Sequence, residues 1–355
     1  MGIVGVAKRA LVGRKLRSNQ LGETLLPKRI ALPVFASDAL SSVAYAPDEI
    51  FLTLSLGGLS AYAFNWKIGV AVVLVMLTVV ASYRQNVHAY PSGGGDYEVA
   101  TVNLGPKAGV TVASALLVDY VLTVAVSISS GVQNATSALP WLNGHEATAA
   151  SALVIILMAL NLRGAKESGT AFAVPTYLFM GSILLMGAWG YFRYLFGELP
   201  QVASAQYEIK PEAPYESFAG FAMVFLLARA FSSGCAALTG VEAISNGVPA
   251  FKKPKSKNAA TTLLLLGTIA ISMLMSIVVL ADLMHLRYVE DPAHQLLLDG
   301  KPIGSGYEQD TVIGQLASAL YGNSPLFYFT IACTGLILVL AANTAFNGFP
   351  VLGSI

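Results

Sequence analysis

Long apolar stretches recur along the 355-residue chain, and they constrain its fold more than any other feature. A helix that crosses a membrane needs about 20 mostly apolar residues. We therefore expect eight spans, at residues 30–56, 67–84, 108–138, 147–162, 171–196, 217–248, 259–283 and 326–350. Only 12% of the residues are charged, against about 25% in a typical soluble domain. The sequence predicts an all-α polytopic membrane protein and argues against a soluble globular enzyme.

The charge and cysteine content argue against several other classes of protein. The formal net charge of +1 offers no electrostatic footprint for nucleic acid. Cys235 and Cys333 stand in apolar surroundings without the spacing of a metal site, which is typical of buried thiols. The sequence contains no recognisable nucleophile–base pair and no cofactor-binding loop. We expect neither enzymatic activity nor a cofactor, and the partner that surrounds the chain is expected to be the lipid bilayer.

The basic residues predict how the spans are oriented. Fifteen of the 21 Lys and Arg residues fall in segments that the eight spans would place on one side. Because positively charged loops stay in the cytoplasm, we expect a cytoplasmic N-terminal segment, 1–29, and a transmembrane domain, 30–355, in the cell membrane. Segment 284–325 is then an external loop with a short helix over TVIGQLASALYG. No polar tail follows the eighth span, so we expect a fragment of a longer protein.

Spans one and six contain polar interruptions at matching places. The first reads LPVFASDALSSVAYAPDEIFLTLSLGGL and the sixth reads FAMVFLLARAFSSGCAALTGVEAISNGV. Such breaks are tolerated where they line a cavity or are buried in protein. Two breaks five spans apart are what an inverted five-helix repeat predicts, with a first repeat at 30–196 and a partial second repeat at 217–355. The alternative is a pair of kinked helices whose serines bond to the preceding turn. Asp48 and Glu49 follow Pro47 and are expected to cap the second half of span one.

Three carboxylates, on Asp38, Asp119 and Glu242, lie inside predicted spans. Each costs about 2.5–3.5 kcal/mol at the centre of a membrane helix, which makes it a candidate functional residue. Glu242 is our candidate proton carrier, because it lies just past the sixth-span break; the alternative is a hydrogen-bond anchor. Asp38 alternatively caps the broken helix, and Asp119 alternatively pairs with Arg229. Arg229 itself either holds a gate by pairing with an acid or extends outward to the interface.

The residues around these carboxylates form oxygen-rich helix faces. Helical spacing gives one stripe of Asp38, Ser41, Ser42 and Tyr45 and a second stripe of Asp119, Thr123 and Ser127, with Tyr120 beside it and Thr239 three residues before Glu242. Oxygen ligands suit a hard cation. Hydroxyls and carbonyls replace the hydration shell of a monovalent ion without holding it too tightly to leave. We expect a monovalent cation site whose ligands are Asp119, Thr123, Ser127 and Thr239.

A glycine-rich segment, AYPSGGGDYEVATVNLGPKAG, connects spans two and three. It lacks the G-x-x-x-x-G-K-[ST] pattern and the strand–helix context of a nucleotide-binding loop. We expect a flexible cytoplasmic turn that leads into a short amphipathic helix.

The PSGGGDY and LGP parts of this segment resemble the loop after the second helix in the amino acid–polyamine–organocation (APC) superfamily, whose members have the LeuT-type inverted repeat. The motifs FASDALSSVAYAPDEI and RAFSSGCAALTGVEAISNGVPAFKKP resemble more narrowly the KimA-type potassium importers, a group placed in the KUP family of potassium–proton symporters. The resemblance covers essentially the whole chain. It implies a LeuT-type fold with discontinuous helices one and six. That fold is incomplete here, because family members have about twelve spans.

The resemblance also implies roles for individual residues. It matches Asp38 and Tyr45 to the ion path and its gating, and Glu242 to the proton-coupling acid. It matches Asp119, Tyr120, Thr123, Ser127 and Thr239 to potassium sites. Potassium and protons are the implied partners, and the full-length protein is expected to form a homodimer. Family members have a C-terminal domain that can bind a cyclic dinucleotide, so that regulation requires a domain outside this chain.

These observations predict the uptake of potassium ions coupled to protons by alternating access. The alternative is an amino acid or polyamine permease of the APC superfamily. Asp38 would repel a substrate carboxylate, so a polyamine fits the first break better than a neutral amino acid does. A third class is a sensor or scaffold that transports nothing.

Overall fold

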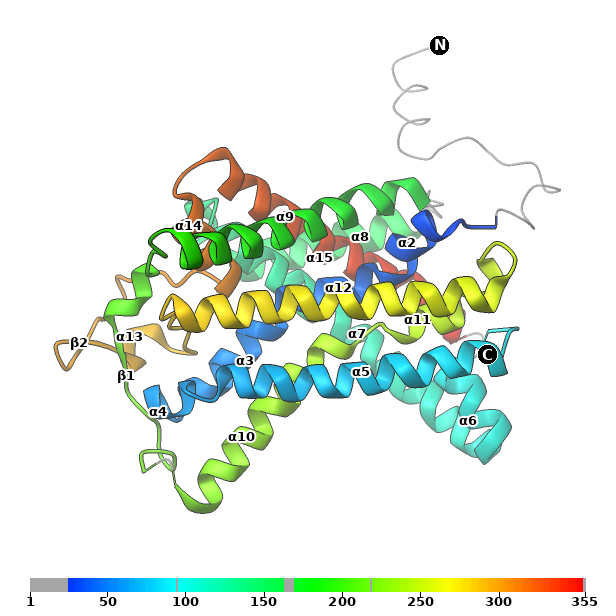
Figure 1. Ribbon diagram of the computed structural model, residues 1–355, viewed down its shortest axis with the longest axis horizontal. Coiled ribbons are helices and arrows are strands. Elements are labelled where there is room, and N and C mark those ends of the chain that lie inside the picture. The colour runs from blue at the N-terminus through cyan, green and yellow to red at the C-terminus, as the bar shows by residue number, and fades with distance from the viewer. Residues whose placement is uncertain (1–24, 94, 163–168, 218, 354–355) are drawn as a thin grey trace, which may run out of the picture.

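The computed structural model describes residues 25–93, 95–162, 169–217 and 219–353. Within these residues the chain forms a bundle of long helices, most of which run along one direction (Figure 1). The predicted all-α class is confirmed. Most of the N-terminal segment, Gly94 of the glycine-rich loop, and the orientation-determining residues Arg163 and Lys166 lie outside the described residues.

Seven helical segments of the described chain are long and apolar enough to cross a membrane: Lys28–Ser55, Gly58–Ala89, Pro106–Thr136, Phe172–Phe196, Gly220–Asn246, Lys255–Leu283 and Pro325–Pro350. They confirm seven of the eight predicted spans. The remaining one, at 147–162, corresponds to α8 (Glu146–Leu162), an apolar helix of 17 residues. A helix of this length extends about 25 Å, which is the lower limit for crossing a bilayer.

Three of the spans comprise more than one helix. The first consists of α2 (Lys28–Ser41), the 3-10 turn η2 (Ser42–Ala44) and α3 (Ala46–Ser55), and the second of α4 (Gly58–Tyr62) and α5 (Asn65–Ala89). The sixth predicted span consists of α10 (Gly220–Gly234), η5 (Cys235–Leu238) and α11 (Glu242–Asn246). The other long helices are α7 (Pro106–Thr136), α9 (Gly169–Phe196), α12 (Lys255–Leu283) and α15 (Pro325–Leu352). The predicted discontinuities in spans one and six are confirmed.

The packing of the spans pairs elements five positions apart. The most extensive contact joins α7, the third predicted span, to α15, the eighth. The next joins α5 to α12, the second span to the seventh. α3 of the first span packs along α10 of the sixth. This pairing is the arrangement that two interlocked five-helix repeats would produce, and it buries the first span most deeply of the seven.

Short elements gather at the two ends of the bundle (Figure 1). The end that we call the α14 end holds α13 (Pro292–Gln295), α14 (Val312–Tyr321) and a sheet of β1 (Glu208–Ile209), β2 (Leu296–Leu298) and β3 (Lys301–Pro302). The strands pair antiparallel in the order β1-β2-β3, with Ile209 opposite Leu296 and Leu298 opposite Lys301. α14 confirms the short helix predicted over TVIGQLASALYG.

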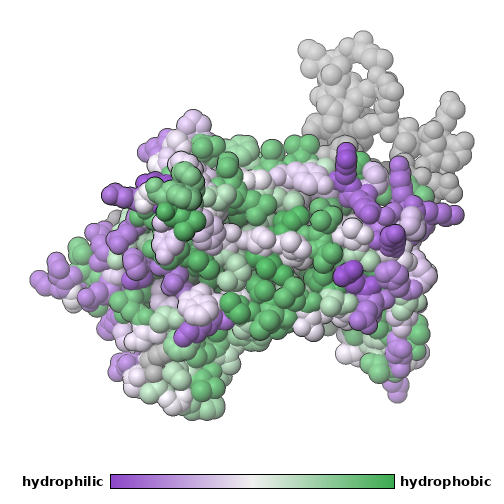
Figure 2. Space-filling view, in the orientation of Figure 1, coloured by the Kyte–Doolittle hydropathy of each residue, from purple (hydrophilic) through white to green (hydrophobic). Residues whose placement is uncertain are grey.

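The other end, the α6 end, holds α6 (Asp96–Leu104) together with the starts of α2 and α12 (Figure 1). The 3-10 turns η3 (Pro140–Leu142), η4 (Ala203–Gln206) and η6 (Val248–Ala250) complete the described elements. Figure 2 shows apolar side chains over the middle of the molecule and hydrophilic side chains towards its two ends. Many large apolar residues of the described chain are exposed, among them Leu74, Val118 and Phe225. The chain is a multi-pass membrane protein.

Candidate functional site at the two helix breaks

The first break is built by serines that bond to the backbone of Asp38. The Ser41 hydroxyl donates to the Asp38 carbonyl over 2.6 Å, and the Ser42 hydroxyl approaches the same carbonyl at 3.2 Å. Such bonds compete with the regular helix ladder. Pro47, which has no N–H to donate, lies in the first turn of α3. α2 therefore ends at Ser41, and the chain re-forms a helix at Ala46.

The second break depends on Gly240. Its φ of +78° lies in the left-handed region that favours glycine. A Cβ atom at this position would lie 2.8 Å from the Asp38 carboxylate oxygen Oδ2 and 2.8 Å from the backbone nitrogen of Ala39. Two independent reasons therefore require glycine at this position: the left-handed backbone conformation, and the first span, which lies too close to leave room for a Cβ atom. α11 resumes the helix at Glu242.

Hydroxyl contacts join the two breaks. The side-chain oxygens of Ser42 and Thr239 lie 2.6 Å apart, and the Tyr45 hydroxyl donates to the Ser42 oxygen over 3.3 Å. Thr239 also donates to the Ala236 carbonyl over 3.0 Å. Together with the Gly240–Asp38 contact, these bonds hold the two interruptions against each other inside the bundle.

Two cavities lie on either side of this junction. The first, which we call the hydroxyl cavity, has a volume of about 480 Å³ and is lined by Tyr45, Glu49, Asp119, Leu122, Thr123, Val126, Ser232, Ser233, Cys235, Ala236 and Thr239. The second, the Glu242 cavity, has a volume of about 250 Å³ and is lined by Phe35, Asp38, Tyr120, Glu242, Ala243, Asn246, Gly247, Thr344, Ala345 and Gly348. Ser42 connects them, because it contacts Asp38 on one side and Thr239 on the other.

The predicted site residues are thus divided between two chambers. Tyr45, Asp119, Thr123 and Thr239 line the hydroxyl cavity, and Asp38, Tyr120 and Glu242 line the Glu242 cavity. Ser127 lies on the same face of α7 as Asp119 and Thr123 but lines neither cavity. The structure brings together oxygens from spans one, three and six, as expected, but places them in two neighbouring chambers.

Among the predicted site residues, two buried oxygens have no hydrogen-bond partner within the described chain. They are Oδ1 of Asp38 and the hydroxyl of Ser127. Ser127 is fully buried and Asp38 is 9% exposed. Leaving a buried polar group unsatisfied costs about 1–3 kcal/mol. Unpaired buried acceptors of this kind are suited to receive a cation that has lost its water.

Asp48 has a different partner from the one that the sequence suggests. Its carboxylate accepts a hydrogen bond from the backbone N–H of Val312 over 3.1 Å, so it caps α14 rather than its own helix α3. No side-chain cap is present at the start of α3. Glu49, assigned to the same cap, instead lines the hydroxyl cavity. Sequence spacing could not reveal either outcome, because α14 lies 264 residues further along the chain.

Arg229 is exposed on α10 and forms no ion pair with any carboxylate of the described residues. The proposed pairing of Arg229 with Asp119 is therefore absent from this part of the chain.

Three residues missed by the sequence analysis also belong to the site. Ser232 and Ser233 line the hydroxyl cavity, and Gly240 shapes the junction. The sequence signal for the serines was their position three and four residues after Arg229 on the same helix.

The glycine-rich loop packs against the end of α11. Gly93 has a φ of +106°, and a Cβ atom there would lie 3.2 Å from the Asn246 carbonyl oxygen. At Gly95 a Cβ atom would meet the side chain of Asn246, which lines the Glu242 cavity. The predicted short helix, α6, follows directly, but it is not amphipathic, because its apolar residues do not gather on one face and none of them is buried. The Tyr83 hydroxyl donates to Asp96 at its start over 2.6 Å. The loop thus closes against the sixth span beside the Glu242 cavity.

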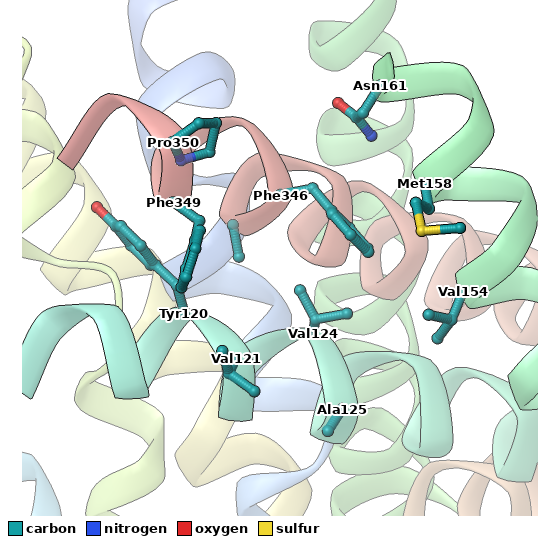
Figure 3. Close-up of a pocket in the computed structure, with 11 residues that line it drawn as sticks. Tyr120, Val121, Val124, Ala125, Val154, Met158, Asn161, Phe346, Phe349 and Pro350 are labelled. Atoms are coloured by element: carbon teal, nitrogen blue, oxygen red, sulfur yellow. The ribbon is translucent and has the colours of Figure 1, made fainter. Parts of the chain in front are cut away.

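A third cavity lies between α7, α8 and α15 (Figure 3). Its volume is about 630 Å³, and its lining is apolar apart from Tyr120 and Asn161. Figure 3 shows the ring of Tyr120 beside Phe349, on the opposite side of the pocket from Met158. Tyr120 also lines the Glu242 cavity and so separates the two spaces.

Comparison with known proteins places these features in a family. A family model described as "Amino acid permease" matches residues 35–352. The potassium transporter KimA of Bacillus subtilis (strain 168) is 43% identical over 345 residues, which is 97% of this chain and 53% of that protein. The chain therefore spans about half the length of this relative. The similarity confirms the predicted resemblance, and permeases are transporters rather than enzymes. From the match over both helix breaks and both cavities, the chain belongs to the amino acid permease family.

Proposed function

We propose that this chain forms the ion-binding part of a secondary active transporter that takes up potassium, coupled to protons, by alternating access across the cell membrane. The observation that carries the proposal is the buried junction of the two breaks, where the Asp38 oxygen Oδ1 lacks a partner in the described chain. The 43% identity to a potassium transporter supports potassium as the ion. With the N-terminus in the cytoplasm, the Glu242 cavity faces inward and the hydroxyl cavity faces outward.

The hydroxyl cavity is suited to receive the ion first. Asp119 supplies a negative charge, and the Tyr45, Thr123 and Thr239 hydroxyls supply neutral oxygens. Oxygen ligands of this type replace the hydration shell of a weakly hydrated monovalent cation. The membrane potential adds about 2.3 kcal/mol per charge per 100 mV to inward movement.

Passage to the Glu242 cavity requires the junction to open. The Ser42–Thr239 contact lies between the two cavities, so the half-helices of spans one and six must separate there. Glu242 then lies in the chamber that the ion enters, with Asp38 in the same lining. Two carboxylates in one chamber favour a state in which one is protonated. Proton release from Glu242 as potassium leaves would couple the two movements.

An amino acid or polyamine permease is the second candidate, and the description of the matching family favours it. Amino acid carriers of this architecture hold the substrate carboxylate with backbone amides at a helix break. In this chain the first break presents the Asp38 carboxylate to the cavity. This charge would repel a substrate carboxylate, so of the two organic substrates a polyamine fits better.

Rubidium flux into proteoliposomes at two external pH values tests the proposal. We expect uptake that is faster at the lower external pH and is unaffected by amino acids or putrescine. Glu242→Gln should abolish the pH dependence, and Asp119→Asn should weaken apparent affinity for the ion. Asp291→Asn, which alters an exposed carboxylate paired with His294 far from both cavities, serves as the control. If the rate of rubidium uptake did not change with external pH, the proposed proton coupling would be wrong. Competition by putrescine would favour the second candidate.

A further inference from the structure

Two chain segments with several basic residues are held side by side at the α6 end. The N–H of Leu26 donates to the Ala250 carbonyl over 2.8 Å, and the N–H of Lys252 donates to the Leu26 carbonyl over 3.1 Å. These bonds form a parallel bridge between Leu26 and Phe251. The bridge places the start of α2 beside the start of α12. The basic residues of the two segments are Lys28, Arg29, Lys252, Lys253, Lys255 and Lys257.

Four of these side chains are exposed and unpaired within the described chain. Arg29, Lys252, Lys253 and Lys257 are exposed, and none of them forms an ion pair with a described carboxylate. We call these four residues the basic surface. Lys255 differs, because its ammonium group donates to the Pro249 carbonyl over 2.6 Å. The first turns of α2 and α12 contain no acidic residue. The positive ends of both helix dipoles therefore add to the charge of the side chains.

The basic surface lies at the starts of two helical segments that are long and apolar enough to cross a membrane. The ends of such segments are where lipid headgroups would meet the protein. Figure 2 shows hydrophilic side chains gathered at this end, next to the apolar middle of the molecule. Clusters of four or more Lys and Arg residues beside a membrane helix attract anionic lipids, at about 1 kcal/mol for each residue.

The basic residues at the opposite end differ in this respect. Lys67, Lys210 and Lys301 are exposed there, and Arg193 and Arg287 are partly buried. The Lys67 ammonium lies over the Phe64 ring, 4.4 Å from its centre, and the Arg193 guanidinium donates to the Glu198 carbonyl over 3.0 Å. The charges of Lys67 and Arg193 are therefore engaged within the chain, and only the segments of Lys210 and Lys301 are joined by backbone pairing, through the sheet β1-β2-β3.

From this clustering we infer that the basic surface is a binding surface for the headgroups of anionic phospholipids. It adjoins the Glu242 cavity through a ring contact. Phe251 stacks on Phe35 with ring centres 5.5 Å apart, and Phe35 lines that cavity. Bound lipid would thus hold the start of the first span against the loop that precedes α12. This inference does not depend on which ion or molecule is transported.

Native mass spectrometry of the chain in mixed phosphatidylglycerol and phosphatidylcholine tests the inference. We expect retained lipid to be enriched in phosphatidylglycerol, and the enrichment to fall as salt is added. Each single neutralisation, such as Lys253→Gln, should lower the enrichment about fivefold, the equivalent of 1 kcal/mol. The variant R29Q/K252Q/K253Q/K257Q should lose the enrichment, whereas R29K/K252R/K253R/K257R should keep it.

The matched control is K67Q/R193Q/K210Q/K301Q, which removes the same number of charges at the α14 end. It should retain the phosphatidylglycerol enrichment of the unaltered chain. Equal losses in the two neutralised variants would overturn the inference, because they would indicate a response to net charge alone. So would an enrichment that neither variant changes. If the fourfold neutralised variant fails to insert, the single variants and the salt titration decide the question.

Discussion

The hydroxyl oxygens of Ser42 and Thr239 lie 2.6 Å apart, although 197 residues separate them in the sequence. This contact joins the interruptions of spans one and six and lies between the hydroxyl cavity and the Glu242 cavity. Residues on either side of it are therefore the most informative positions for mutation.

Replacing Gly240 by alanine should destabilise the junction strongly. A left-handed alanine costs about 1–2 kcal/mol, and its Cβ would also collide with the Asp38 carboxylate and the Ala39 nitrogen. Thermal unfolding in detergent measures the effect. Gly144→Ala is the matched control, because Gly144 has nearly the same φ, +79°, with no atom within 4 Å of the added Cβ. Equal losses for the two variants would show that the contact with the first span adds nothing.

Replacing Asp48 by alanine should loosen α14. The Asp48 carboxylate is the acceptor for the Val312 N–H at the start of that helix, and losing a helix cap typically costs about 1 kcal/mol. Hydrogen exchange at Val312 and the next residues should accelerate about fivefold. Asp48→Asn keeps an acceptor oxygen and should exchange almost as slowly as the unaltered protein. Unchanged exchange in the alanine variant would mean that α14 is held by its other contacts alone.

Replacing Ser127 by alanine should weaken the response to potassium without lowering stability in its absence. The Ser127 hydroxyl is buried and has no partner in the described chain, so removing it sacrifices no protein hydrogen bond. The measurement is the shift in Tm when potassium chloride replaces choline chloride. Ser182→Ala is the control, since the Ser182 hydroxyl already donates to the Phe179 carbonyl over 2.9 Å. A variant with the full potassium shift would exclude Ser127 from the ion site.

Replacing Gly95 by alanine should disturb the glycine-rich loop through Asn246 alone. The backbone at Gly95 is ordinary, with a φ of −74°, but a Cβ atom would overlap the Asn246 side chain. We expect a loss of about 1–3 kcal/mol, as in other overpacked sites. Combining it with Asn246→Ala should restore most of the stability, which a double-mutant cycle of thermal unfolding measures. If the two substitutions lower stability additively, the effect of Gly95→Ala does not act through the Asn246 side chain.

The loop around Asp310, at the α14 end, should become less stable as pH rises. Burial, supported by the negative charge of Glu308, raises the pKa of the Asp310 carboxyl above its usual value. Because the folded state then holds a proton more tightly than the unfolded state, this stabilisation is complete below the usual pKa of 3.8 and is lost as pH rises through the raised value. Asp310→Asn should flatten this part of the pH profile of Tm. If Tm depended on pH in the same way in Asp310→Asn and in the unaltered protein, Asp310 would not be the group responsible.

Much of the fold follows from local sequence. Apolar length predicts the spans, and the serines and Pro47 predict the breaks, because each acts on the backbone next to it. Helical spacing also predicts the polar stripe of Asp119, Thr123 and Ser127 on α7, and Thr123 and Ser127 are among the buried residues of that helix. α8 is the one predicted span whose apolar length is close to the limit for crossing a bilayer.

The candidate site was less predictable, because its decisive contacts join distant parts of the chain. Local reasoning assigned Asp48 to the nearest helix start, whereas the fold presents it to the start of α14. The division of the site into two cavities follows from the Ser42–Thr239 contact. Neither pairing leaves a signal in the spacing of neighbouring residues.

The separation of the two breaks along the chain also affects biosynthesis. The first span is the least apolar of the seven and the most deeply buried, yet Thr239 and Gly240 are translated roughly 200 residues later. At about 5–20 residues per second, the ribosome needs about 10–40 seconds to supply them. During this interval the nascent segment around Asp38 has to remain at the insertion machinery or beside early neighbours. Final assembly of the core is therefore a late, post-insertion event.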